Sequence, residues 1–442
     1  MKFTNVFGLR NWALLGLVSI ATALVVTPAS AAVDPEVAFI FNTVLFLLGG
    51  FLVFFMAAGF TLLECGLVRS KNVAMQSVKN ITLFSVACVT YALWGYDFMY
   101  GGSEGGFFGD INFFWTASDD LDTFNNGGYG AASDWYFQAM FVATAASIVS
   151  GTVAERVKLW SFLAFVVLLT GIIYPIFGKW TWGAGWLSSY GFLDFAGSTI
   201  VHSVGGWAAL TGAVIIGPRL GKYAADGRVQ PMPGSNLPLA TLGTFILWLG
   251  WFGFNGGSQL ALGTAADAAA IGQIFINTNI AAGGGVVAAI ILTQILYGKV
   301  DLTMVLNGAL AGLVSITAEP LAPTMTQAMI IGAIGGVIVV FAVPLLDKLK
   351  VDDVVGAVSV HLVAGIWGTI IVPFTNSDAN YGAQIVGILA CAALVVPVSA
   401  LFWYIIKLLI GVRVSEEEEE KGLDLAELGM EGYPEFSKGG LN

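Results

Sequence analysis

The segment Asp194-Phe-Ala-Gly-Ser-Thr-Ile-Val-His202-Ser-Val-Gly-Gly206 has a counterpart in Asp353-Val-Val-Gly-Ala-Val-Ser-Val-His361-Leu-Val-Ala-Gly365. In each segment a histidine follows the aspartate by eight residues, and a glycine follows the histidine by four. The chain has only 2 histidines, and both lie inside apolar runs. An ionisable side chain in a membrane segment indicates function, although a single histidine there is also compatible with a hydrogen-bonded packing role. The repeated pattern favours one site shared by two related halves.

The composition around these segments is that of a membrane protein. Of the 442 residues, 57% are hydrophobic and only 11% are charged, with a mean hydropathy of +0.82. Soluble proteins carry about 25% charged residues, so an aqueous surface cannot be covered here. The apolar runs are about 20 residues long, which suits helices, whereas barrel strands span about 10 residues with alternating polarity. We therefore predict an all-α polytopic membrane protein.

Eleven apolar stretches are predicted to be transmembrane helices. They cover residues 37–64, 72–99, 135–154, 159–179, 194–217, 237–256, 269–297, 302–319, 325–345, 354–375 and 382–410. The first 31 residues are typical of a signal peptide, with a basic start (Lys2, Arg10), an apolar core (12–26) and a small cleavage sequence (29–31). An uncleaved first helix is the alternative. The predicted parts are a signal peptide (1–31), a membrane domain (32–412) and a C-terminal tail (413–442).

Basic residues indicate the orientation of the predicted helices. Cleavage leaves the N-terminus outside, and an odd number of spans then places the C-terminus inside. Ten basic residues fall in the predicted inner loops and none in the outer loops: Arg69, Lys71, Arg156, Lys158, Arg219, Lys222, Arg228, Lys299, Lys348 and Lys350. This asymmetry follows the positive-inside rule and supports the predicted topology.

The two histidine segments are separated by five spans, and an odd offset reverses their direction. This pattern is typical of an inverted five-plus-five repeat, whose shared site lies near the midplane. Each histidine lies eight residues into its helix from an opposite face, or about 12 Å at 1.5 Å per residue. Since the apolar core is about 30 Å thick, we expect His202 and His361 to face one another in a dry pore.

At these residues the sequence resembles the ammonium transporter family (the Amt/Mep/Rh proteins), and the resemblance extends over essentially the whole chain after the signal peptide. The stretch from Asp194 to His202 is similar to the family signature. Further similar stretches are Gly66-Leu-Val-Arg-Ser-Lys-Asn72, Ala154-Glu-Arg156, Gly250-Trp-Phe-Gly-Phe-Asn-Gly-Gly-Ser258 and Gly422-Leu-Asp424.

The resemblance implies a plasma-membrane homotrimer with one ammonium pore per subunit, which serves nitrogen uptake. It assigns substrate binding to an outer site and its surroundings, namely Phe137, Phe141, Trp182, Ser258 and Asp194. It assigns pore lining to His202, His361 and Phe254, with Phe141 and Phe254 as a stacked gate. It also implies a PII-type regulatory partner at the cytoplasmic face, met by the loop 219–236 and the tail.

Two positions depart from the family pattern. The tail reads Leu428-Gly-Met-Glu431, where many members of the family have a histidine before the glycine. Glu64 lies at the inner end of the first helix, where some members are apolar, and the sequence assigns it no role.

The chemistry of ammonium explains why such a pore would be apolar. Moving an unpaired cation into an apolar medium costs roughly tens of kcal/mol on the idealised Born estimate. Moving neutral ammonia into the same medium costs far less. Desolvation also lowers the pKa of an ammonium group. We therefore expect ammonium to lose its proton at the gate, while a potassium ion has no proton to lose. Neutral imidazoles provide a donor or an acceptor along the path.

Three other functions remain open in the sequence. An electroneutral gas channel of the Rh kind is the closest alternative, and Trp182 at the outer site favours cation recruitment over it. An ammonium sensor is the second, although the short tail carries no recognisable output domain. An intramembrane enzyme is the third, and no Gly-x-Ser-x-Gly or His-Glu-x-x-His motif supports it. No motif indicates a cofactor, a metal site or nucleic-acid binding.

Overall fold

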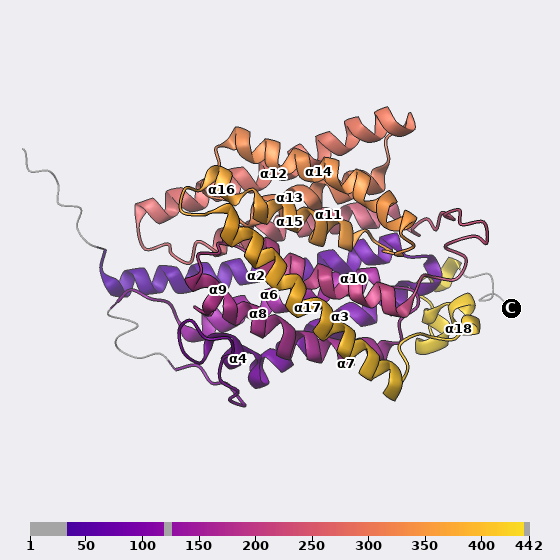
Figure 1. Cartoon of the computed structure of the whole chain (residues 1–442), viewed down its shortest axis with the longest axis horizontal. Helices are drawn as coiled ribbons and strands as arrows, with labels where there is room; N and C mark the ends of the chain where they lie inside the picture. The colour runs from indigo at the N-terminus through magenta and orange to yellow at the C-terminus, as the bar shows by residue number, and fades with distance from the viewer. Residues whose placement is uncertain (1–32, 119–125, 437–442) are drawn as a thin grey trace, which may run out of the picture.

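The structure is a computed structural model that describes residues 33–118 and 126–436. The predicted signal peptide lies outside the described residues. Within them the fold is all-helical, without a β-strand. Figure 1 shows a bundle of long helices, with the start of α2 (Pro35–Leu67) at one end and the short helix α18 (Glu416–Lys421) at the other.

Each of the eleven predicted stretches forms a helix or consecutive helical segments. After α2 these are α3 (Val73–Thr90) with η2 (Tyr91–Gly95) and α4 (Tyr96–Tyr100), α6 (Ala131–Thr152), α7 (Leu159–Leu168) with η3 (Leu169–Ile173) and α8 (Tyr174–Trp180), η4 (Ser198–Ser203) with α10 (Val204–Ile216), α11 (Leu237–Gly257), α12 (Ala265–Tyr297), α13 (Leu302–Thr317), α14 (Met325–Lys348), η5 (Val358–Val363) with α15 (Ala364–Ile370) and α16 (Val372–Thr375), and α17 (Tyr381–Leu409). Within the described residues, nine helical runs are long and apolar enough to cross a membrane. The remaining two are α6 and the 16-residue α13, so the count of eleven spans stays a prediction.

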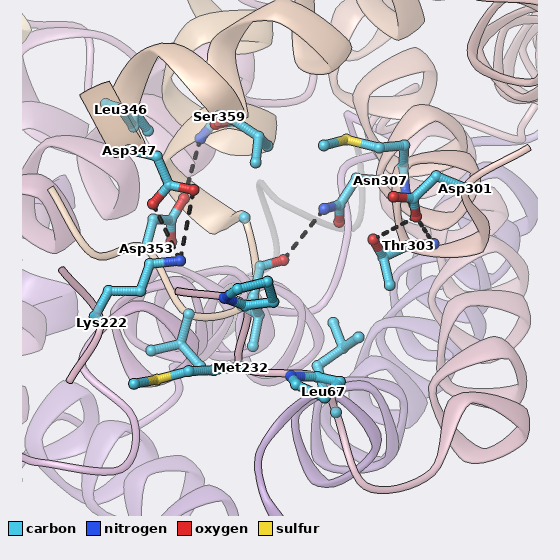
Figure 2. Close-up of a pocket in the computed structure, with 18 of the residues that line it drawn as sticks. Leu67, Lys222, Met232, Asp301, Thr303, Asn307, Leu346, Asp347, Asp353 and Ser359 are labelled. Carbon is cyan, nitrogen blue, oxygen red and sulfur yellow. Dashed lines mark hydrogen bonds and ion pairs between the residues drawn. The ribbon is translucent and has the colours of Figure 1, made fainter. Parts of the chain in front are cut away.

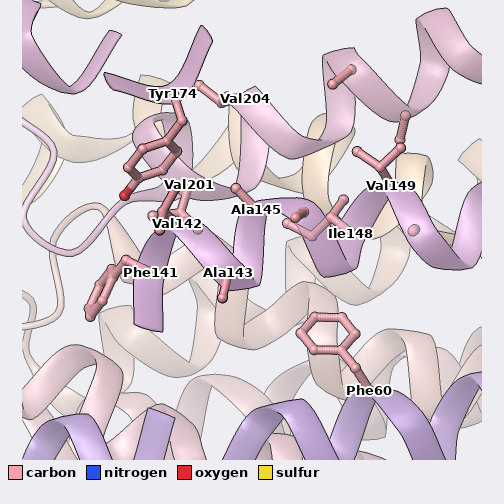
Figure 3. Close-up of a cluster of buried hydrophobic side chains, with 14 of the residues drawn as sticks. Phe60, Phe141, Val142, Ala143, Ala145, Ile148, Val149, Tyr174, Val201 and Val204 are labelled. Carbon is pink, nitrogen blue, oxygen red and sulfur yellow. The ribbon is translucent and has the colours of Figure 1, made fainter. Parts of the chain in front are cut away.

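The helix α6 lies in the centre of the bundle. Every residue from Phe137 to Thr152 is buried. Figure 3 shows Ala145 and Ile148 of this helix in the same cluster of buried side chains as Phe60 of α2 and Val201 of η4. Because α6 is enclosed by other helices rather than by lipid, it tolerates small and polar residues. This explains why it is not among the nine most apolar helices.

Close helix contacts depend on glycine. A Cβ atom on Gly243 of α11 would lie 2.4 Å from the backbone nitrogen of Leu63 in α2. A Cβ atom on Gly66 of α2 would lie 2.5 Å from the backbone nitrogen of Ala240 in α11. These distances are far shorter than van der Waals contact, so α2 and α11 approach as closely as they do because neither position has a side chain.

The two histidine segments have the same local structure. Both η4 and η5 are short π-helical segments that continue as regular helices, and π-helical turns are frequent at functional sites. Each is preceded by a glycine with positive φ, 110° at Gly197 and 82° at Gly356, which is a conformation that glycine adopts without strain. The carboxylate of Asp194 accepts hydrogen bonds from the backbone N–H groups of residues 197–200. That of Asp353 accepts them from residues 357–359. The two segments paired in the sequence therefore share one local structure, whereas the inverted five-plus-five repeat stays a prediction.

Candidate functional site

An aromatic pocket of about 160 Å³ lies at the end of the bundle that is predicted to face outside. We call it the outer pocket, and it is lined by Tyr100, Tyr129, Asp134, Phe137, Gln138, Phe141, Trp182, Phe195, Ser258 and Leu260. The indole N–H of Trp182 donates to the carbonyl oxygen of Asp194 at 2.9 Å, which fixes the ring. The hydroxyl of Ser258 donates to the carbonyl oxygen of Phe254 at 2.8 Å. A lone pair of the Ser258 oxygen therefore remains available to an N–H donor in the pocket.

Four of the five predicted substrate-binding residues line the outer pocket, and Asp194 does not. Both carboxylate oxygens of Asp194 accept backbone N–H groups at the start of η4, at 2.8 to 3.0 Å. The structure thus places Asp194 where it positions the histidine segment. Asp134 is the acidic residue that lines the pocket, and it is 6% exposed and accepts a hydrogen bond from the hydroxyl of Tyr96.

Stacked aromatic rings close the floor of the outer pocket. The rings of Phe141 and Phe254 are stacked, with centroids 4.1 Å apart and an interplanar angle of 28°. Both side chains are buried. Beneath them the imidazole of His202 stacks on Phe254 at 5.3 Å and on Trp251 at 5.0 Å. The path from the pocket to the first histidine therefore passes a fully apolar constriction.

The two histidines contact each other at the centre of the bundle. Their Nδ1 atoms are 3.1 Å apart, and their ring centroids are 5.1 Å apart. A hydrogen bond between two Nδ1 atoms requires one ring to donate and the other to accept. The donating ring then has an acceptor at Nε2, and the accepting ring has an N–H at Nε2. Among the described residues, Nε2 of His202 has no hydrogen-bond partner, so this nitrogen is free to bind a small polar molecule.

Two neighbouring spaces lie on the other side of the histidine pair. A narrow cavity of about 10 Å³ borders His361, Phe60, Glu64 and Ser147, among other residues. A wide cavity of about 370 Å³, which we call the inner vestibule, opens beyond it. Asn307 and Val355 line both spaces. Figure 2 shows the polar side chains of the inner vestibule, including Asp301, Asp347, Asp353 and Lys222. The buried histidine pair therefore lies between an aromatic pocket at one end of the bundle and a larger space with polar side chains at the other.

Charged groups fix the backbone around the inner vestibule. The guanidinium of Arg219 donates to the carboxylate of Asp352 at 2.8 and 2.9 Å, and to Glu155 at 3.1 Å. The buried guanidinium of Arg156 donates to the carbonyl oxygen of Asp352 at 2.8 Å. Burial alone would raise the pKa of Asp352, but the hydrogen bonds from Arg219 and the charges of both arginines hold this pKa well below its usual range.

The C-terminal tail packs back onto the same end of the bundle. Arg413 donates to the carboxylate of Glu419 at 2.7 Å. The carboxylate of Asp424 accepts the backbone N–H groups of Ala74 and Met75, at the start of α3, at 3.0 and 2.7 Å. The tail therefore holds the start of α3 through the Asp424 that the family resemblance singled out.

The sequence did not predict some of the residues that line the site. Tyr100, Gln138 and Phe195 line the outer pocket, but no motif distinguishes them from other aromatic and polar residues. Asp134 was detectable in principle, because it precedes Phe137 and Phe141 by three and seven residues in one helix. This spacing places all three on the same helix face.

Comparison with known proteins gives a consistent result. A model of the Ammonium Transporter Family matches residues 44–433. The ammonium transporter Amt2 of Archaeoglobus fulgidus is 39% identical over 422 residues, which cover 88% of this chain and 87% of that protein. Amt1 of Haloferax mediterranei is 40% identical over 431 residues, covering 91% and 81%.

Solved structures are similar over the same region. A structure titled Sensor Amt Protein has a TM-score of 0.81 and 36% identity, covering 87% of this chain and 98% of its own. Mep2 of Candida albicans has a TM-score of 0.76 and 26% identity, covering 85% and 87%.

Proposed function

Because this chain belongs to the ammonium transporter family, we propose that it binds ammonium in the outer pocket, removes its proton at the aromatic constriction and conducts ammonia past His202 and His361. The family consists of transport proteins rather than enzymes, and the chain is a multi-pass membrane protein. The observation that carries the proposal is the 3.1 Å contact between the two imidazoles, in a buried path between two polar spaces.

The outer pocket has the chemistry to attract a small cation. Aromatic faces such as those of Trp182 and Phe137 attract a cation by roughly 0.5–2 kcal/mol each, depending on its hydration. The hydroxyl oxygen of Ser258 can accept one N–H bond, and the carboxyl group of Asp134 borders the same space. An ammonium ion satisfies all of these contacts.

The constriction beneath the pocket favours loss of the proton. Phe141 and Phe254 replace water with apolar ring faces, and desolvation disfavours the charged form of an amine. A potassium ion also benefits from the aromatic faces but has no neutral form. Selectivity therefore follows from the ability of ammonium to become ammonia.

The histidine pair suits a neutral permeant. Ammonia both donates and accepts hydrogen bonds, and the pair presents one donor and one acceptor at its Nε2 atoms. We propose that the proton then follows through the paired histidines, so that net transport is electrogenic. The runner-up is electroneutral conduction of ammonia alone.

A liposome experiment tests this function. The full-length protein reconstituted in liposomes is expected to give a current in response to an ammonium pulse, and none in response to potassium. Strictly electroneutral flux across a pH series would favour a gas channel of the Rh kind. Ligand binding without flux would favour a sensor, as the name Sensor Amt Protein says of one similar structure.

The finer architecture is proposed on the same basis. We propose eleven spans with the N-terminus outside and the tail inside, and a homotrimer in the plasma membrane with a cleaved signal peptide. A PII-type protein at the cytoplasmic face would meet the loop 219–236 and the tail. Labelling of cysteines introduced into the predicted outer and inner loops, in intact and permeabilised cells, tests the orientation.

A further inference from the structure

Glu64 is a buried carboxyl group to which the proposed function assigns no role. It lies near the end of α2 and is 1% exposed. Its Oε2 atom accepts three hydrogen bonds, from the side chains of Gln76, Asn80 and Ser150. In the described part of the chain, its Oε1 atom has no hydrogen-bond partner. One oxygen is therefore anchored and the other is free.

A buried lysine lies beside this carboxyl group. The side chain of Lys79 is 0% exposed and donates to the carbonyl oxygen of Ser150 at 2.8 Å. The hydroxyl of Ser150 donates to Oε2 of Glu64 at 2.7 Å, so this one residue bridges the two charged groups. The ammonium of Lys79 offsets part of the cost of burying an ionised carboxylate. The free Oε1 atom provides a place for an added proton.

Glu64 and His361 border the same cavity of about 10 Å³. A space of about this size holds roughly one water molecule. Asn307 and Val355, which also line this cavity, line the inner vestibule as well. One space therefore lies between His361 and Glu64, and it shares two lining residues with the inner vestibule. The titratable groups that face Glu64 are Lys79 from α3 and His361 from η5.

We propose that Glu64 is the proton acceptor on the vestibule side of the histidine pair. This inference rests on the proposed function, in which ammonium divides into ammonia and a proton. The proton leaves the imidazolium of His361, passes through the water molecule and binds Oε1, which converts the carboxylate to a neutral carboxylic acid. Release of the proton to water in the inner vestibule restores the carboxylate. Only N–H and O–H bonds change, and no other reactant is required.

The substitution Glu64→Gln separates proton transfer from packing. The amide keeps an oxygen for the three donors but cannot take up the proton. In liposomes holding the full-length protein, the ammonium-elicited current is expected to fall roughly tenfold or more. A pH dye in the lumen should now report alkalinisation, because ammonia then enters without its proton. The matched control Thr61→Val, one turn earlier in α2, removes a hydroxyl that donates to the carbonyl oxygen of Ala57 and leaves the contacts of Glu64 in place, so it should retain the wild-type current.

The outcomes distinguish this inference from the proposed function. A wild-type current in Glu64→Gln would overturn the inference. Loss of the current without any alkalinisation in Glu64→Gln would also overturn it, because the carboxyl group would then be needed to conduct ammonia itself. Alkalinisation without current in the wild type would overturn the proton route but leave ammonia transport intact. A wild type that gives neither signal would instead refute the transport function.

Discussion

Replacing His202 by alanine removes the side chain that joins the two halves of the path. Its imidazole stacks on Trp251 and Phe254 and contacts His361 through Nδ1. The substitution leaves a space bounded by these three side chains. It also leaves Nδ1 of His361 without its partner, which costs about 1–3 kcal/mol unless water replaces the lost contact. We therefore expect water to enter the centre of the path.

The size of the effect follows from the cost of a dry crossing. Transferring an ion from water into an apolar medium costs roughly tens of kcal/mol on the idealised Born estimate. A gap that admits water, which occupies about 30 Å³ per molecule in the liquid, lowers this barrier by at least a few kcal/mol. Since about 1.4 kcal/mol changes a rate tenfold, potassium conduction by His202→Ala should rise roughly 100-fold or more.

A potassium gradient across liposomes, with a potential-sensitive dye, measures this change. His361→Ala should behave in the same way, because it opens the other side of the same contact. Val201→Ala is the matched control, since it removes buried methyl groups from the same segment without touching the imidazoles. If His202→Ala passes no more potassium than empty liposomes and keeps its ammonium current, the argument from a dry histidine pair is refuted.

Three further predictions concern the ends of the path. Trp182→Leu should raise the apparent KM for ammonium by roughly 2- to 30-fold, the equivalent of one cation–π contact. Trp160→Leu, which replaces an exposed tryptophan, should leave this KM unchanged. The dependence of the current on ammonium concentration gives the KM of each variant. Asp194→Ala should abolish transport and lower the thermal midpoint, because four backbone N–H groups lose their acceptor. The transport rate and thermal midpoint of Asp194→Asn should lie between those of the wild type and those of Asp194→Ala. A thermal midpoint of Asp194→Ala equal to that of the wild type would contradict the role of Asp194 as acceptor for these N–H groups. The ionised form of Asp352 stabilises the fold above its unfolded pKa of about 3.9, and this contribution should fade as the pH falls towards the lower folded value. Asp352→Asn should therefore show a flatter loss of thermal stability in acid than the wild type, and parallel profiles would argue against the ion pair with Arg219.

Much of the architecture was predictable from hydropathy and from the repeated segment. All eleven stretches are helical because a buried backbone must satisfy its own hydrogen bonds. The meeting of His202 with His361 was predictable because two segments of opposite direction, with equal depth, reach the same plane. The family predicted by the resemblance is confirmed by the match over residues 44–433.

Other features of the site could not be predicted from the sequence. The outer pocket combines Asp134 from α6 with Tyr100 from α4, which are distant in sequence and carry no shared motif. The burial of Asp194 in hydrogen bonds to its own segment depends on the backbone turn at Gly197. Glu64 has a free oxygen only because Gln76, Asn80 and Ser150 all bind the other one.

The sequence by itself determined the class of fold, the pairing of two histidines and the family, since these depend on composition, periodicity and local repeats. Only the tertiary structure decided which side chains face the path and which polar atoms are left without partners. The physical reason is that accessibility and hydrogen-bond saturation are properties of the packed neighbourhood. In this protein that neighbourhood is assembled from helices far apart in the chain.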